Sequence, residues 1–99
     1  MISIDNRFPA APTGLAARAG ATTAVLNWAA APEPHAVDGY TVFRNGVAIG
    51  RTEGTNFAVA GLEEATGYVF TVAAVDAAGR LANSTPVALL THTTAIQIG

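Results

Sequence analysis

The sequence of 99 residues contains no cysteine and no lysine. Without cysteine the chain can form no disulfide, no thiolate metal site and no cysteine nucleophile. Seven acidic residues and five arginines give a formal charge of −2, so few cations are present to neutralise phosphate groups. The charge balance therefore argues against nucleic acid as a partner.

Long apolar runs are missing as well. The longest uncharged stretch, residues 81–99, contains proline, asparagine, glutamine, histidine and several threonines, and is too polar for a bilayer core. Residues 1–8 include Asp5 and Arg7 and lack the apolar segment of a signal peptide. The sequence predicts no membrane insertion. Two origins stay open: a complete protein, located in a virion or an extracellular assembly, or a module excised from a longer secreted protein.

Short apolar runs separated by turn residues are present instead. Their apolar residues recur with a period of two, and glycines and prolines interrupt every alanine-rich piece that could form a helix. Asn45-Gly46 is typical of a two-residue hairpin turn, because both residues accept a positive φ. The pattern predicts an all-β domain with seven strands, at residues 14–18, 22–28, 38–44, 47–51, 56–60, 67–75 and 85–91.

Alternation along these strands assigns one set of side chains to a common core. Each fully buried large side chain contributes about 1.5–3 kcal/mol, so this set is sufficient for one core. The predicted inward residues are Ala24, Leu26, Trp28, Tyr40, Val42, Phe57, Val59, Tyr68, Phe70, Val72 and Ala74.

Groups of residues along the chain occur in an order that resembles a known family. The groups are Ala11-Pro12-Thr13-Gly14-Leu15, Val25-Leu26-Asn27-Trp28, Val37 to Gly46, Gly61-Leu62 followed by Thr66-Gly67-Tyr68, and Phe70 to Gly79. In this order they resemble the fibronectin type III domain, especially the bacterial form found beside catalytic modules of secreted polysaccharide-degrading enzymes.

The resemblance covers about residues 9–92. It implies a seven-stranded antiparallel β-sandwich of immunoglobulin-like type, in which strands one, two and five face strands three, four, six and seven. Residues 1–8 and 93–99 would then be extensions, and both alternate in a way that could form strands. Members of the family serve as spacers, adhesion modules and interaction surfaces, and none of the shared positions is catalytic.

Three of the shared residues also have a direct physical interpretation. Leu62 is expected to close one end of the core. Tyr68 is expected to turn its hydroxyl back to the backbone of the preceding loop, forming a tyrosine corner. Trp28 without a cysteine pair favours this family over a disulfide-bonded immunoglobulin domain.

The residues that could carry chemistry are few and scattered. His35 and His92 lack a third ligand at a usable spacing, so no metal site is predicted. Asp38 and Asp76 lie at strand ends, where short acids commonly accept hydrogen bonds from the backbone. The sequence therefore predicts no catalytic residue, no metal and no cofactor, and the chain is interpreted as a non-enzyme.

The predicted contact surface lies on the outward faces of the third and sixth strands. These faces carry Thr41 and Phe43, then Val69, Thr71, Ala73 and Val75, and are less polar than a solvated sheet should be. Scattered exposed apolar groups are one interpretation, and a contact patch centred on Phe43 is the other. The candidate partner-binding residues are Phe43, Val69 and Thr71 on this face, with Ile2, Ile4, Ile96 and Ile98 in the extensions.

Two functions follow from these expectations. The first is a small structural or interaction subunit that decorates or joins a larger assembly such as a virion, through protein partners or self-assembly. The alternative is a spacer or accessory domain of a secreted bacterial glycoside hydrolase. A carbohydrate partner has weaker support, because Trp28, Tyr40 and Tyr68 are all expected to be buried rather than exposed as sugar platforms.

Overall fold

The computed structural model describes residues 11–30 and 37–93. Within these ranges the chain forms strands and no helix, so no helix there is long and apolar enough to cross a membrane. The strands are β1 (Thr13–Ala19), β2 (Ala24–Ala29), β3 (Val37–Arg44), β4 (Val47–Thr52), β5 (Asn56–Val59), β6 (Gly67–Asp76), β7 (Leu81–Asn83) and β8 (Val87–Leu90).

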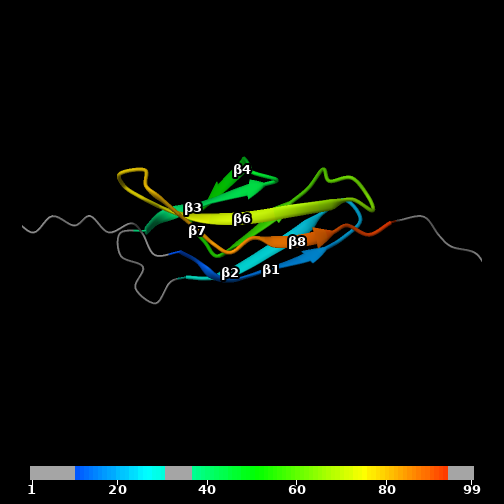
Figure 1. Cartoon of the computed structure of the whole chain (residues 1–99), viewed down its shortest axis with the longest axis horizontal. Helices are drawn as coiled ribbons and strands as arrows, with labels where there is room; N and C mark the ends of the chain where they lie inside the picture. Colours follow the sequence, from blue (N-terminus) through cyan, green and yellow to red (C-terminus); the bar gives the residue numbers. More distant parts are fainter. Residues whose placement is uncertain (1–10, 31–36, 94–99) are drawn as a thin grey trace, which may run out of the picture.

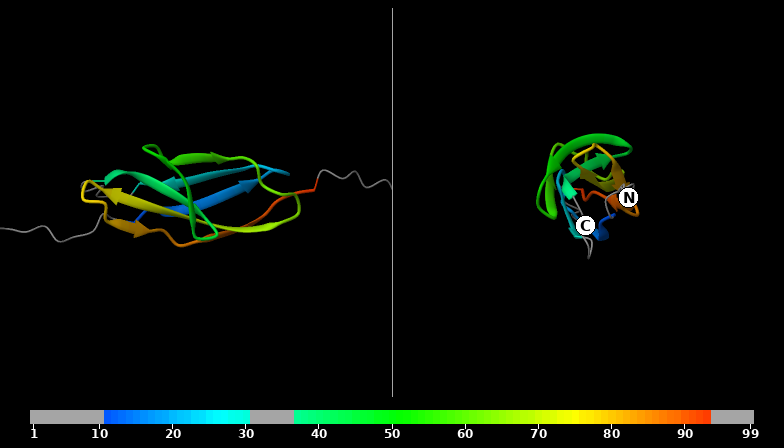
Figure 2. Two further views of the ribbon diagram at one scale, coloured as in Figure 1. Left: turned by 90° about the horizontal axis from the view of Figure 1, so that it is seen from above. Right: turned by 90° about the vertical axis from the view of Figure 1, so that its left-hand side faces the viewer.

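The strands build two antiparallel sheets. One has the order β1-β2-β5, and the other has the order β4-β3-β6, with β7 and β8 both pairing with the free edge of β6. This is the division of strands that the resemblance implied. In the end-on view the strands surround a common interior (Figure 2).

Different parts of the chain lie at the two ends of the sandwich. At the leading end the chain enters β1, whose Thr13 lies opposite Ala29 at the end of β2. At the trailing end the segment after β8 meets the turn after β1, where the His92 N–H donates to the Gly20 carbonyl. Figure 1 shows these ends on opposite sides of the molecule.

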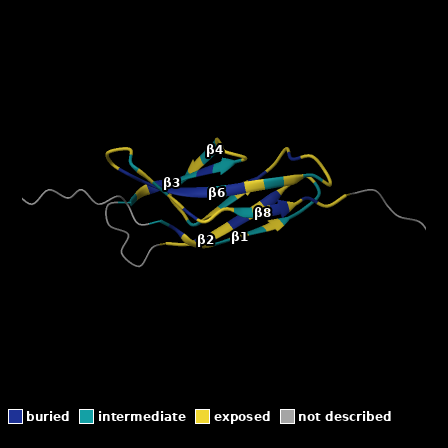
Figure 3. Cartoon of the chain, in the orientation of Figure 1, coloured by how far each residue is buried: buried dark blue, intermediate teal, exposed yellow. Residues whose placement is uncertain are grey.

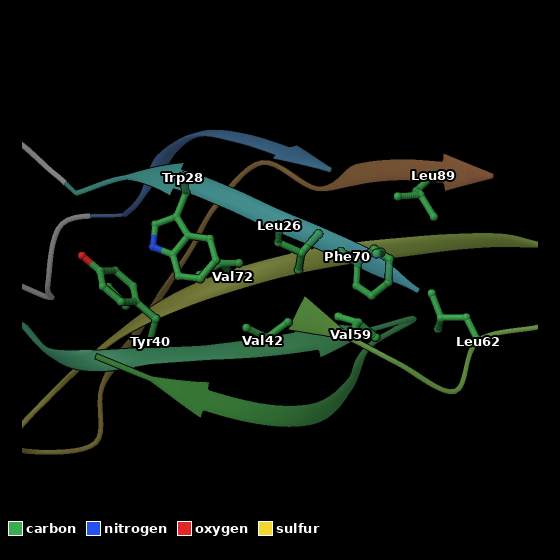
Figure 4. Packing of buried hydrophobic residues seen from close by; sticks show 11 residues of the cluster. Leu26, Trp28, Tyr40, Val42, Val59, Leu62, Phe70, Val72 and Leu89 are labelled. Atoms are coloured by element: carbon green, nitrogen blue, oxygen red, sulfur yellow. The ribbon is translucent and has the colours of Figure 1, made fainter. Parts of the chain in front are cut away.

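The core lies between the sheets, and its members come from nearly every strand (Figures 3 and 4). Trp28 and Tyr40 meet edge to face with ring centroids 5.4 Å apart, while Leu62 and Leu89 lie toward the other end of the cluster. Most predicted inward residues are buried, but Phe57 and Tyr68 are half-buried at its margin. The buried residues of the cluster are Ala24, Leu26, Trp28, Tyr40, Val42, Val59, Leu62, Phe70, Val72, Ala74 and Leu89.

The last predicted strand, residues 85–91, is the shorter β8, and an additional strand, β7, precedes it in the segment 76–84 that was expected to be a loop. Ser84 and Pro86 cause the interruption between β7 and β8. The Val72 N–H donates to the Ser84 hydroxyl at 3.1 Å, where a regular ladder would offer a carbonyl, and Pro86 has no N–H to give. Both short strands nevertheless continue along the same edge of β6.

The predicted hairpin turn at Asn45-Gly46 is present, with φ of 51° and 84° at its two residues. Asn45 also ties this turn to the start of β6, since its N–H donates to the Val69 carbonyl and its side-chain oxygen accepts from the Val69 N–H at 2.8 Å. Gly50 in β4 lies under the Phe57 ring, and a Cβ there would come within 2.4 Å of that ring. The absence of a side chain at Gly50 therefore allows β4 and β5 to approach.

Candidate interaction surface

The outer face of the larger sheet brings together three of the predicted contact residues. Phe43 of β3 is paired directly with Thr71 of β6, and paired residues of an antiparallel ladder project on the same side. Val69 lies two residues before Thr71 on β6 and therefore shares this face. Its exposure of 44% is high for a large apolar residue in a central strand.

Leu81 and Asn83 of β7 complete this surface. They are paired with Val75 and Ala73 of β6, which places both on the same outer face. Leu81 is 47% exposed. Together with Phe43, Gly46 and Thr71 they line a shallow depression in the sheet surface. We call the residues Phe43, Val69, Thr71, Leu81 and Asn83 the outer-face patch.

Two residues expected on this face are not available for contact. Ala73 and Val75 have exposures of 0% and 7%. The prediction that they form part of an open surface was wrong, because residues 76–84 were expected to be a loop. β7 lies there instead, and its larger side chains stand beside the small ones of β6.

The same error explains why the sequence prediction omitted Leu81 and Asn83. A sequence signal for them exists in Gly79, because glycine accepts the positive φ that tight turns require. In the structure Gly79 has a φ of 85° in the turn after β6, which returns the chain antiparallel to β6. Reading Gly79 as a hairpin turn would have placed Leu81 opposite Val75. The other predicted contact residues, Ile2, Ile4, Ile96 and Ile98, lie outside the described residues.

Asp76 closes the turn between β6 and β7 rather than facing a cleft. Its carboxylate accepts from the N–H groups of Ala78 and Arg80, and from Arg80 Nε at 2.8 Å. Burial by itself would raise the pKa of Asp76, but the hydrogen bonds and charge of Arg80, with the Ala78 N–H, lower it below its ordinary value. The carboxylate is thus a structural anion, paired within its own turn.

The remaining candidates for chemistry are also separated. Asp38 is exposed and lies 3.3 Å from Arg51 of the neighbouring strand. His92 is exposed near the chain's exit, and His35 lies outside the described residues. In residues 11–30 and 37–93 no three histidine, cysteine, aspartate or glutamate side chains gather as a metal site would require.

The sandwich also contains the predicted tyrosine corner. Tyr68 stands at the start of β6, and its hydroxyl oxygen accepts a hydrogen bond of 2.8 Å from the Glu63 N–H in the preceding loop. Leu62, in the same loop, is 4% exposed and belongs to the core cluster. Both features agree with the expectations drawn from the resemblance.

Comparison with known families confirms that resemblance. The family model for the fibronectin type III domain matches residues 10–89. The chain belongs to the fibronectin type III family. Among solved structures, a human fibronectin type III domain superposes with a TM-score of 0.80 at 21% identity, covering 92% of this chain and 93% of that one. An Fn3-like protein from Clostridium thermocellum gives 0.71 at 27% identity, covering 93% and 100%.

Curated relatives of the chain include bacterial polysaccharide-degrading enzymes. Exoglucanase B of Cellulomonas fimi is 41% identical over 91 residues, which is 91% of this chain and 8% of that protein. Chitinase A1 of Niallia circulans is 43% identical over 79 residues, covering 78% and 11%. The fibronectin type III chain spans between 7% and 15% of the length of the relatives compared, so most of each relative lies outside the match.

Proposed function

We propose that this fibronectin type III domain is a non-catalytic connecting module of a secreted bacterial polysaccharide-degrading enzyme. The observation that carries the proposal is the position of the two ends of the domain. The chain enters beside Thr13 and leaves beside Gly20, at opposite ends of β1. At about 3.3 Å per residue, that strand separates the two points by roughly 20 Å. The similarity to an exoglucanase and a chitinase supplies the enzymatic setting.

The other hypothesis, a subunit of a larger assembly such as a virion, has no support from the similarity to the exoglucanase, the chitinase and the human fibronectin type III domain. Self-assembly through open sheet edges is a further form of it, since the chain has no lysine to protect an edge. The edges are interrupted by other means. β1 and the β3–β4 pair have register shifts, β5 has only four residues, and Ser84 and Pro86 separate β7 from β8. Such irregularities discourage pairing with another strand.

A carbohydrate-binding role is less well supported than a connecting role. Sugar platforms use exposed planar rings, and each aromatic residue in the described part of the chain is buried or half-buried. On the outer face of the larger sheet, Phe43 is half-buried and lies beside Thr71. Any polysaccharide contact of the whole enzyme is therefore assigned to other modules.

The outer-face patch is proposed as the surface that contacts an adjoining module of the same polypeptide. Its five residues are few compared with the roughly 20–30 per side of a standard stable interface, so a freely diffusing partner would bind weakly. A tethered module reaches an effective concentration in the millimolar range, at which a small contact is still populated. The patch residues are uncharged, so a complementary surface would be uncharged as well.

Sedimentation equilibrium of the isolated chain tests the connecting role against self-assembly. The proposal predicts a monomer of 10.0 kDa across the micromolar range, and no retention on insoluble cellulose or chitin. A concentration-dependent dimer or larger species would favour an assembly subunit. Retention on the polysaccharide would favour a binding module. Mass spectrometry of the mature secreted polypeptide would show directly whether the domain is joined to a hydrolase.

For the patch, the informative experiment compares the complete polypeptide with its Val69→Ser and Leu81→Ser variants by small-angle scattering. Loss of a docked arrangement in both variants, but not in a Val25→Ser control on the other sheet, is the expected result. Val25 is 42% exposed and so matches the patch residues in accessibility. Identical scattering from all four proteins would contradict the proposed contact.

A further inference from the structure

The segment that follows β8 is attached to the rest of the domain by a set of hydrogen bonds that none of the functions considered above requires. We name the residues involved, Gly20, Glu63, Ala65, Thr66, Thr91 and His92, the exit clamp. They come from the turn after β1, the loop before β6 and the segment after β8. The clamp therefore joins three parts of the chain at the trailing end, one of them from the smaller sheet (Figure 1).

Thr91 is the centre of the clamp. It is 3% exposed, although it lies just past the end of the last strand. Its hydroxyl donates to the Glu63 carbonyl at 2.6 Å and accepts from the Thr66 N–H at 2.9 Å. Its own N–H donates to the Thr66 carbonyl at 3.1 Å. The Thr91 hydroxyl thus bonds to backbone groups of Glu63 and Thr66 that a continuing strand would otherwise have paired with its own backbone.

His92 is held through its backbone on two sides. Its N–H donates to the Gly20 carbonyl at 2.9 Å, and its carbonyl accepts from the Ala65 N–H at 3.1 Å. Gly20 follows β1 of the smaller sheet, whereas Ala65 precedes β6 of the larger one. The exit point is therefore attached to both layers of the sandwich.

Ala65 adopts a conformation that is unfavourable for alanine. Its φ is 50°, in the left-handed region where a Cβ is disfavoured by about 1–2 kcal/mol. Such a residue persists only when surrounding contacts determine its conformation. The bond from the Ala65 N–H to the His92 carbonyl is one such contact, so the backbone strain coincides with the attachment of the exit segment.

We propose that the exit clamp fixes the point at which the polypeptide leaves the domain, so that the fold itself, and not the following segment, sets where the next part of the chain begins. The biological meaning of this inference rests on the proposed connecting function. The clamp itself is a property of this chain, and its test does not depend on which protein the chain belongs to.

The test uses amide hydrogen exchange and ¹⁵N relaxation on the isolated chain and on Thr91→Val, which keeps the shape of the side chain but removes its hydroxyl. In the unsubstituted chain the His92 amide should have an order parameter of about 0.85, the value for rigid backbone. In Thr91→Val we expect it to fall below about 0.6. The Ala65 and Thr66 amides should exchange roughly tenfold faster, as the loss of about one hydrogen bond allows.

Two further variants complete the design. Thr91→Ser retains the hydroxyl and should keep the protection of the Ala65 and Thr66 amides. Thr41→Val makes the same substitution on the outer sheet face and should leave the trailing end unchanged. The inference is overturned if His92 is already mobile in the unsubstituted chain, or if Thr91→Val leaves its order parameter and both exchange rates unaltered. If Thr91→Val does not fold, the unsubstituted chain and Thr91→Ser decide. A rigid His92 in a domain that proves to be an assembly subunit would support the clamp and refute the connecting function.

Discussion

At the leading end of the domain, the turn between β6 and β7 is closed by the Asp76 carboxylate and the Arg80 guanidinium, whereas Tyr68 and Thr91 close the trailing end with hydroxyl groups. The core also differs between its two ends. The aromatic Trp28–Tyr40 pair lies near one end, and the aliphatic Leu62 and Leu89 lie toward the other (Figure 4). A charged closure responds to pH, but a neutral closure does not. The comparison therefore predicts that acid weakens one end of the sandwich before the other.

The leading end also contains an unsatisfied polar group. Trp28 Nε1 is buried without a hydrogen-bond partner in the described part of the chain. A buried donor without a partner lowers stability, so the aromatic pair contributes chiefly through packing. At the trailing end the hydroxyls of Tyr68 and Thr91 both have partners.

The largest expected effect is at the aromatic pair. Trp28→Ala should lower the free energy of unfolding by about 3–5 kcal/mol, because it removes a large side chain that contacts Tyr40 across the core. Urea denaturation followed by circular dichroism measures the loss. A midpoint close to that of the unsubstituted chain would show that Trp28 is not a core residue.

A smaller, pH-dependent effect is expected at Asp76. Because hydrogen bonds lower its pKa in the folded state, the folded carboxylate binds protons less readily than the unfolded one. Its stabilising contribution is complete above the unfolded pKa of about 3.9 and is lost as the pH falls through the folded value. Asp76→Asn should therefore destabilise the domain at pH 7, and this difference should shrink at about pH 2.

The control for that prediction is Asp38→Asn. Asp38 pairs with Arg51, but their side chains are 61% and 52% exposed, and exposed pairs contribute about 0–1 kcal/mol. Denaturation at both pH values should show little change for this variant. An Asp76→Asn difference that stays constant with pH would mean that the carboxylate charge does not close the leading end.

Tyr68→Phe tests the neutral closure at the trailing end. It removes the acceptor of the Glu63 N–H and should cost about 0.5–1.5 kcal/mol. Because no charge is involved, the loss should be equal at neutral and acidic pH. If the stability lost in Tyr68→Phe varied with pH, the two ends would not differ in their response to acid as the comparison predicts.

The smallest effect, and the only stabilising one, is expected at Ala65. Glycine adopts positive φ without steric cost, but it also loses more conformational freedom on folding. Ala65→Gly should therefore raise the free energy of unfolding by up to about 1 kcal/mol, with exchange at His92 unchanged. Destabilisation would show that the positive φ of Ala65 is not a source of strain.

These two ends also show what the sequence could predict. The division of strands between the sheets and the Tyr68 hydroxyl bond were expected from the resemblance to the fibronectin type III domain. The Asn45-Gly46 turn was expected because both residues accept a positive φ. β7 was missed because three residues, Leu81 to Asn83, are too short for a periodic signal. The wrong prediction that Ala73 and Val75 form part of an open surface followed from that omission.

The exit clamp lay beyond sequence reasoning for a different reason. Thr91 is one threonine among several near the end of the chain, and only the fold brings it to Glu63 and Thr66, 28 and 25 residues away. Hydrogen bonds at such separations are set by tertiary packing and leave no local pattern. The same holds for His92, whose role is carried by its backbone rather than by its imidazole.

The most direct test of the central claim is a distance measurement between the two ends of the domain. The chain has no cysteine, so Thr13→Cys with His92→Cys gives two unique sites for spin labels. Both residues are exposed. Double electron–electron resonance should give one narrow peak at roughly 20–30 Å, the length of β1 plus the labels. A broad distribution, or a peak below about 15 Å, would contradict a fold that holds its entering and leaving segments apart.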